Sequence, residues 1–66
     1  MAKIQLNGKK ISLKSKTSIK QLLSKHKLLN KRVAIELNGK MIPSTKYKIY
    51  LKDNDIMEIV HFIGGG

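Results

Sequence analysis

Residues 56–66 read IMEIVHFIGGG, an apolar, strand-like run that passes directly into three glycines and is the most informative part of the chain. Side chains alternate between the two faces of a strand, so Met57 and Ile59 would share one face. The opposite face would carry Ile56, Glu58, Val60 and Phe62. A strand that is apolar on both faces has to be covered on one of them by the rest of the chain.

One segment of the chain has the spacing of an amphipathic helix. Ser18 and Gln21 stand in the S-x-x-Q order of a capping box, which satisfies the first backbone N–H groups of a helix. Further residues recur at helical spacing, namely Ile19, Leu22, Leu23 and His26. The pattern predicts a short helix from about Ile19 to Lys27, with one face toward the sheet.

A β-hairpin is predicted before the helix. Residues 3–6 and 10–13 alternate polar and apolar side chains around Asn7-Gly8, which is the strongest short signal for a hairpin turn. Four apolar side chains can face the same side of this hairpin: Ile4, Leu6, Ile11 and Leu13.

A second hairpin is predicted after the helix. Residues 32–37 and 40–42 are strand-like, and they enclose a second turn signal at Asn38-Gly39. This hairpin adds two more strands to those of the first hairpin and the final strand.

The connection from the second hairpin to the final strand is less sharply patterned. Pro43 ends the second hairpin, because proline has no N–H group to donate to a sheet. Residues 44–50 are open between a loop, a helical turn and a short strand around residues 48–50. Residues 51–55 form a connector rich in turn residues.

The predicted order is hairpin, helix, hairpin and final strand, which is a ββαββ pattern followed by one more strand, and it makes one domain in a chain of 66 residues. The order is typical of an α+β fold with one helix across one face of a single sheet. The other face of the final strand then has no helix to cover it, and exposed apolar rows of that kind tend to mark partner surfaces. The alternative is a final strand at an edge, covered by residues 44–51.

Charge is the most unusual feature of the composition. The net charge is +10, and the basic residues are thirteen lysines and a single arginine, Arg32. Such a charge favours acidic partners, nucleic acid or an anionic surface. The lysines are spread along the whole chain, however, as on an ordinary solvated surface, and specific phosphate or base recognition favours arginine.

Several kinds of chemistry find no support in the sequence. The absence of cysteine excludes a disulfide, a thiolate metal site and a thiol nucleophile. No metal site is predicted, because Asp53 and Asp55 are interpreted as turn residues, and His26 and His61 match no zinc spacing. No apolar stretch approaches the roughly 20 residues of a membrane helix and no signal peptide is visible, so a soluble cytoplasmic protein is expected.

The terminal glycines predict a tail that is distinct from the folded body. We expect a domain over residues 1–63 and a flexible tail of Gly64, Gly65 and Gly66. Glycine has no Cβ and can pass through narrow spaces, and residues 62–66 could span roughly 16 Å when extended. Such a tail could place its carboxylate in the active site of another protein. A frayed terminus is the alternative reading.

The ordered set of segments resembles the β-grasp, or ubiquitin-like, fold and, more closely, the ThiS family of sulfur carrier proteins of thiamine thiazole biosynthesis. The resemblance covers essentially the whole chain. It is carried by residues 4–8, 18–23, 33–43 and 53–60, followed by Gly64-Gly65-Gly66. It implies a mixed sheet with one helix across one face, and a protein that is a substrate of enzymes rather than an enzyme.

The resemblance also implies the chemistry at the C-terminus. A ThiF-like activating enzyme would use ATP and Mg to adenylate the carboxylate of Gly66, and a sulfur donor system would convert it to a thiocarboxylate. A ThiG-like thiazole synthase would receive the sulfur. The chain itself would bind no cofactor and supply no catalytic residue. Gly64, Gly65 and Gly66 would enter the partner active sites, and the candidate docking face consists of Ile56, Glu58, Val60 and Phe62.

Other functions remain compatible with the residues. Related carriers on the same fold are the small subunit of a molybdopterin synthase, a tRNA-thiolation carrier and a protein modifier. A basic RNA-binding β-grasp module is a further alternative. Its weakness is the shortage of aromatic rings for base stacking, since only Tyr47, Tyr50 and Phe62 are present.

Overall fold

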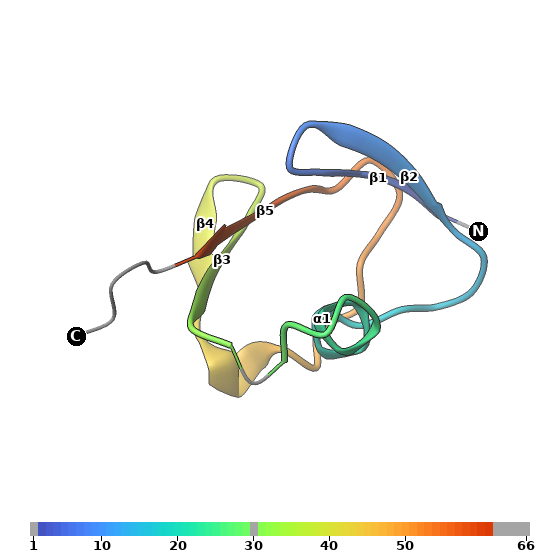
Figure 1. The fold of residues 1–66 in the computed structure, drawn as a ribbon. Coiled ribbons are helices and arrows are strands. Elements are labelled where there is room, and N and C mark those ends of the chain that lie inside the picture. The colour runs from blue at the N-terminus through green and yellow to red at the C-terminus, as the bar shows by residue number, and fades with distance from the viewer. Residues whose placement is uncertain (1, 30, 62–66) are drawn as a thin grey trace.

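The computed structural model describes residues 2–29 and 31–61, which form a five-stranded mixed sheet with one short α-helix against it (Figure 1). The strands are β1 (Ala2–Leu6), β2 (Lys9–Leu13), β3 (Val33–Leu37), β4 (Lys40–Ile42) and β5 (Ile56–His61). The helices are α1 (Ile19–Lys25) and a 3₁₀ helix, η1 (Ser44–Lys46). The predicted α+β class is confirmed.

The final strand, β5, lies at the centre of the sheet, whose order is β2-β1-β5-β3-β4. It pairs parallel to β1 and antiparallel to β3. The two hairpins, β1–β2 and β3–β4, are antiparallel and lie on either side of it. The alternative of an edge strand covered by residues 44–51 is therefore wrong, because β5 is held by a neighbour on each side.

Both hairpin turns adopt the geometry that the Asn-Gly pairs predict. Asn7 and Gly8 have φ values of 49° and 84°, and Asn38 and Gly39 have φ values of 52° and 85°. Two successive residues with positive φ are the mark of a type I′ turn, whose twist matches that of the flanking strands.

The capping box at the start of α1 forms as predicted. Ser18 N–H donates to Gln21 Oε1 at 2.8 Å, and Gln21 N–H donates to Ser18 Oγ at 3.1 Å. The helix ends at Lys25 rather than at Lys27, because Lys27 adopts a left-handed φ of 60° that a helix cannot continue. His26 is therefore an exposed C-cap residue and does not extend the buried face.

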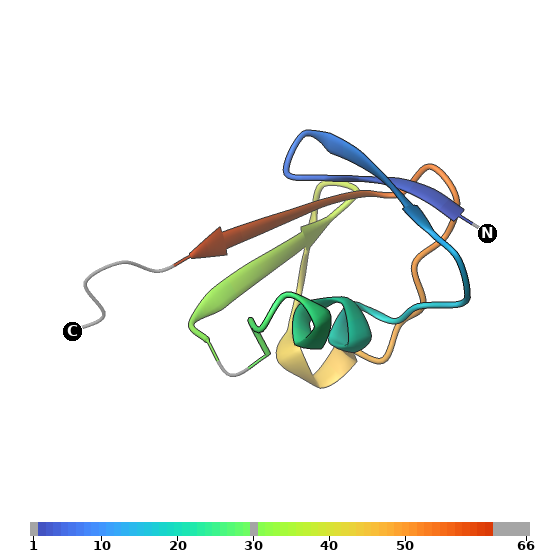
Figure 2. The ribbon, with the colours of Figure 1, turned by 45° about the vertical axis from the view of Figure 1, so that its right-hand side comes forward.

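The core lies between α1 and the inner face of the sheet. It consists of Ile4, Leu13, Ile19, Leu22, Leu23, Ile35, Leu51 and Met57. Leu6 and Ile11 pack against it, which confirms the predicted apolar face of the first hairpin. Each large aliphatic side chain buried here contributes about 1.5–3 kcal/mol of transfer free energy. Figure 2 shows α1 and η1 on the same side of the sheet, so none of the helices in residues 2–29 and 31–61 covers the other side.

The connection from β4 to β5 contains a helical turn, one of the readings that the sequence left open. Pro43 follows β4, and η1 begins at the next residue. No strand forms over residues 48–50, where Tyr50 makes a single isolated bridge with Ser18. The bridge ties this connection to the start of α1.

Candidate functional site

The outer face of β5 is the part of the predicted site that the structure describes. Ile56 and Val60 are 47% and 51% exposed, and Glu58 between them is also exposed. Met57, in contrast, is 0% exposed, and Ile59 packs against the core. The predicted division of this strand into a core face and an outer face is therefore confirmed.

The remaining predicted site residues, Phe62, Gly64, Gly65 and Gly66, lie outside the described residues. β5 ends at His61, which pairs with Val33 at the start of β3. The outer face therefore belongs to the strand that directly precedes the C-terminal residues of the chain.

Three residues that the sequence analysis missed extend this face across β3 and β4. Ala34 lies opposite Val60, and Glu36 lies opposite Glu58, in the pairing of β3 with β5. Met41 lies opposite Glu36 in the pairing of β3 with β4 and is 64% exposed. Alternation along each strand could have assigned these residues to a face, but the register between strands decides which of them meet.

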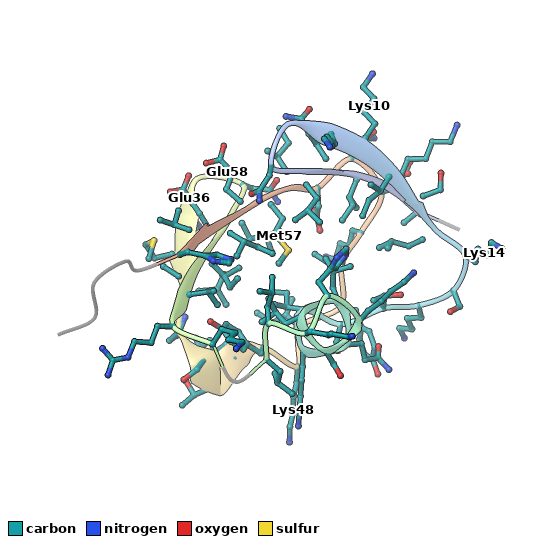
Figure 3. The ribbon with its side chains drawn as sticks, in the orientation of Figure 1. Lys10, Lys14, Glu36, Lys48, Met57 and Glu58 are labelled. Atoms are coloured by element: carbon teal, nitrogen blue, oxygen red, sulfur yellow. The ribbon has the colours of Figure 1, made fainter. Side chains whose placement is uncertain are left out.

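We call the resulting surface the outer patch, defined as Ala34, Glu36, Met41, Ile56, Glu58 and Val60. Figure 3 shows Glu36 and Glu58 projecting near each other from the outside of the sheet, while Met57 points toward the helix. Lys10, Lys14 and Lys48 lie well away from this pair in the same view. The outer patch is thus an apolar surface with two carboxylates near its centre.

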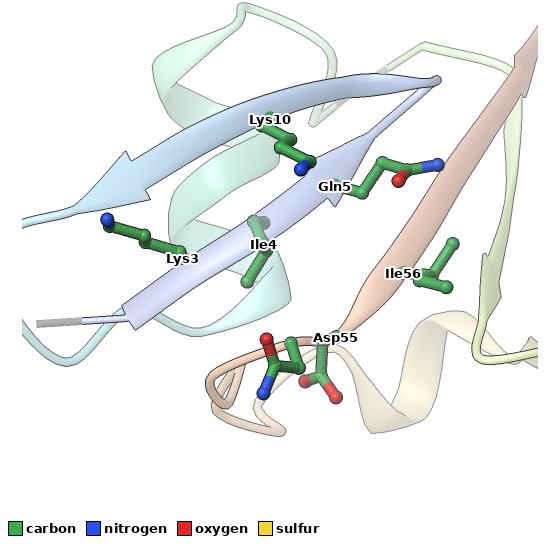
Figure 4. A pocket seen from close by; sticks show the side chains of 7 residues that line it. Lys3, Ile4, Gln5, Lys10, Asp55 and Ile56 are labelled. Atoms are coloured by element: carbon green, nitrogen blue, oxygen red, sulfur yellow. The ribbon is translucent and has the colours of Figure 1, made fainter.

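The half of the outer face that β1 and β2 form has the opposite charge. A shallow pocket of about 250 Å³ lies there, next to the start of β5 (Figure 4). Its lining includes Lys3, Gln5, Lys10, Asp55 and Ile56. The open side of the sheet thus carries Lys3 and Lys10 on β1 and β2, and Glu36 and Glu58 on β3 and β5.

The two aspartates are turn residues, as the sequence predicted. Asp53 Oδ1 accepts a hydrogen bond from the backbone N–H of Lys3 at 2.8 Å. Asp55 accepts one from the side-chain amide of Asn38 at 2.9 Å and one from the backbone N–H of Lys52 at 2.7 Å. Both carboxylates are therefore used within the chain, where they fix the turn that leads into β5.

The two histidines lie apart, His26 at the end of α1 and His61 at the end of β5, as predicted. Across residues 2–29 and 31–61, no three His, Cys, Asp or Glu side chains are grouped so that they could hold a metal ion. In the same part of the chain, no helix has both the length and the apolar character needed to cross a bilayer.

Asparagine side chains from both hairpin turns hold β5 in place. Asn7 Oδ1 accepts a hydrogen bond from the N–H of Ile59 at 2.7 Å, one residue past the end of β1. Asn38 Oδ1 accepts one from the N–H of Ile56 at 2.8 Å, and its own N–H donates to the Ile56 carbonyl at 2.7 Å. Each asparagine side chain therefore adds a hydrogen bond to β5 just beyond the last residue of its own strand, β1 for Asn7 and β3 for Asn38. The sequence predicted the turns but not this second role.

Comparisons with known proteins give matches over nearly the full length of the chain. The sequence model of the ThiS family matches residues 3–66. The chain is 45% identical over 65 residues to the sulfur carrier protein ThiS of Bacillus subtilis, a match that covers 96% of this chain and 98% of that protein. It is also 32% identical over 65 residues to a thiazole synthase of Paramagnetospirillum magneticum, covering 97% of this chain and 20% of that protein.

A solved structure shows the same fold. The crystal structure of the thiamine biosynthesis protein ThiS from Geobacter metallireducens matches with a TM-score of 0.80 at 29% sequence identity. The match covers 97% of this chain and 99% of that one. The mixed sheet with one helix is therefore the β-grasp arrangement that the resemblance implied.

Proposed function

The chain belongs to the ThiS family and is a sulfur carrier of thiamine biosynthesis, and on that premise we propose that the carboxylate of Gly66 carries the sulfur. Residues 1–63 then form the β-grasp domain, and Gly64, Gly65 and Gly66 form its tail. The family match supports this assignment because it continues to residue 66. In this function the chain is a carrier protein on which other enzymes act.

The proposed chemistry follows from the low reactivity of a carboxylate, whose oxygen is a poor leaving group. A ThiF-like adenylating enzyme binds ATP with Mg, the Gly66 carboxylate attacks the α-phosphate, and pyrophosphate leaves. Sulfur that the donor system delivers at the sulfide level (HS⁻) then attacks the acyl carbon. The new C–S bond forms as the C–O bond to AMP breaks, which yields the thiocarboxylate. Glycine leaves this carbon sterically open, because it has no side chain.

The observation that carries the proposal is the open face of β5 next to the C-terminal residues. Ile56, Glu58 and Val60 are exposed on this strand. Phe62, which lies outside the described residues, would continue the face by alternation. We propose that the partner enzymes bind here, because binding energy gained away from the reacting carbon can orient the tail in an active site.

The protein that receives the sulfur is proposed to be a ThiG-like thiazole synthase. The support is the thiazole synthase of P. magneticum, in which the region similar to this chain makes up 20% of the protein. A carrier-like region joined to the enzyme in one polypeptide indicates that the two act together. We propose the cytoplasm as their compartment, since the activation step consumes ATP.

The test is an intact-mass measurement. The carrier is incubated with the adenylating enzyme of its own organism, ATP, Mg and a sulfur donor, and its mass should then rise by the difference between sulfur and oxygen. Tandem mass spectrometry should place the change at Gly66. A mass that stays constant while the enzyme consumes ATP would rule out the thiocarboxylate.

A truncated carrier that lacks Gly65 and Gly66 is the matched control. It should gain no sulfur, because the acyl carbon is missing, yet unfold at the same urea concentration as the full chain. Equal sulfur transfer to the truncated carrier would show that the reacting group lies elsewhere.

A further inference from the structure

We propose that Glu36 and Glu58 together bind an arginine side chain of the thiazole synthase, and that this contact fixes the direction in which the carrier docks. The inference rests on the proposed function, because it adds a partner group to the face that this function uses. It also assigns a role to Glu36, which the sequence analysis did not identify as a site residue.

The first support is the way the chain uses its carboxylates. Its four acidic side chains are Glu36, Asp53, Asp55 and Glu58. The two aspartates accept hydrogen bonds at the turn before β5. Among residues 2–29 and 31–61, the side chains of Glu36 and Glu58 make no hydrogen bond or ion pair, although their backbones belong to the sheet. Although the protein has a net charge of +10, the two side-chain carboxylates without a partner in the described part of the chain, those of Glu36 and Glu58, lie directly opposite each other on neighbouring strands.

The second support is the unfavourable placement of the pair. Glu36 and Glu58 are direct partners in the antiparallel pairing of β3 with β5. Side chains in this relation have Cβ atoms about 4.5–5.5 Å apart, and like charges so placed destabilise a sheet. None of the thirteen lysines belongs to the outer patch. A cation from outside the chain would turn this repulsion into attraction to a common charge.

Arginine suits the pair better than other cations do. Its planar guanidinium carries several donors in a fixed fork, is weakly hydrated and can bond two carboxylates at once. Met41 and Val60, both more than half exposed, flank the carboxylates and would pack against the side chain of the arginine. Exclusion of water by these apolar groups would strengthen the charged hydrogen bonds.

The division of charge on the open side of the sheet gives the contact a direction. Lys3 and Lys10 lie on the β1–β2 half, and the glutamates lie on the β5–β3 half. A partner surface with the opposite order of charges can meet this face in one orientation, since reversal would oppose like charges. The end of β5 would then point in one defined direction.

The thiazole synthase is the favoured partner because a region similar to this chain occurs within the thiazole synthase of P. magneticum. Because such a region is part of the same polypeptide as the enzyme, the two remain close together. A charge pair that sets their relative orientation would then act in every catalytic cycle. The adenylating enzyme is the other protein that must approach the same tail, and the experiment separates the two.

The experiment measures the dissociation constant of the carrier with the thiazole synthase of its own organism by isothermal titration calorimetry. The double substitution Glu36→Gln and Glu58→Gln should weaken binding by about tenfold or more, because charged hydrogen bonds are replaced by neutral ones. The double substitution Lys14→Gln and Lys48→Gln, a two-unit charge change of opposite sign and far from the pair, should alter binding by less than about twofold.

A second readout separates recognition from structure. Because the pair is repulsive in the free carrier, the double Glu→Gln variant should unfold at the same or a higher urea concentration than the wild type. Weaker binding together with unchanged or greater stability supports the proposal. Loss of stability in step with loss of binding would overturn it, because the glutamates would then be structural.

Three further outcomes decide the matter. Unchanged affinity of the double variant for the thiazole synthase overturns the proposal, and so does a loss confined to the adenylating enzyme. A charge reversal gives the third outcome. A carrier with Glu36→Lys and Glu58→Lys should bind the wild-type thiazole synthase weakly, and recovery of affinity with a synthase in which one arginine is changed to Glu would support the proposal. The mass assay at Gly66 is independent of these binding measurements. If the carrier gains sulfur but the double variant binds the thiazole synthase normally, the arginine contact is refuted and the proposed function stands.

Discussion

The side-chain oxygen of Asn7 lies 2.7 Å from the backbone nitrogen of Ile59, 52 residues later in the sequence, and accepts its hydrogen bond. This contact extends the pairing of β1 with β5 one step beyond the last residue of β1. It gives the Asn-Gly turn a second function, because the residue that closes the first hairpin also positions the central strand that carries the outer patch.

The first prediction concerns this contact. Asn7→Gly keeps a residue that tolerates the observed φ of 49° but removes the side-chain acceptor. The free energy of unfolding should fall by about 1 kcal/mol, the net value of an intramolecular hydrogen bond. Urea denaturation measures the change. Asn7→Asp, which keeps an acceptor oxygen, should lose less, and equal losses in both variants would contradict the role of the hydrogen bond.

The second prediction compares two methionines on opposite faces of the sheet. Met57 is fully buried and Met41 is 64% exposed. Met57→Ala should cost about 2–5 kcal/mol, because it leaves a cavity in the core. Met41→Ala should change stability by no more than about 0.5 kcal/mol. Thermal unfolding of both variants checks the difference, and a large loss for Met41→Ala would show that the open face is covered in the free protein.

The third prediction concerns the start of α1. Ser18→Ala removes the acceptor for the N–H of Gln21 and should destabilise the protein by about 0.5–2 kcal/mol. Ser18→Thr keeps a hydroxyl at the cap and should retain most of the stability. Denaturant titration followed by circular dichroism gives both values. If alanine and threonine proved equivalent, the capping hydrogen bond would have no measurable role.

The fourth prediction concerns the net charge of +10. Any binding of the carrier to single-stranded RNA should come from lysine attraction to phosphate and should fall by orders of magnitude between about 50 and 200 mM salt. Fluorescence anisotropy with labelled oligonucleotides of different sequence measures the effect. Binding that survives at the higher salt and distinguishes one sequence from another would favour the RNA-binding alternative.

Features that depend on neighbours in the sequence were predicted closely. The capping box at Ser18, the two Asn-Gly turns and the alternation of Met57 with Ile56 are all set by residues within a few positions of one another. The end of α1 was predicted two residues too late. The left-handed conformation that ends a helix usually falls on glycine, but here it falls on Lys27, so the sequence carries no signal for it. Residues 44–50 were left open because no local period dominates there.

The candidate site was predicted only in part, for a related reason. Alternation along one strand identified Ile56, Glu58 and Val60 as a common face. Their neighbours Glu36 and Met41 were missed because they come from other strands. The Asn38-Gly39 turn fixes the register that places Met41 opposite Glu36, but no local signal fixes the register of β3 against β5, which places Glu36 opposite Glu58.

The α+β class, the sites of the turns, the start of the helix and the two faces of the final strand can be predicted from local sequence, because each follows from the periodicity and stereochemistry of adjacent residues. The central place of β5, its hydrogen bonds from Asn7 and Asn38, and the position of Glu36 opposite Glu58 depend on the assembled fold. These relationships join residues far apart in the chain. They arise when burial of Met57, Ile35 and Ile4 in one core selects a single register for the whole sheet.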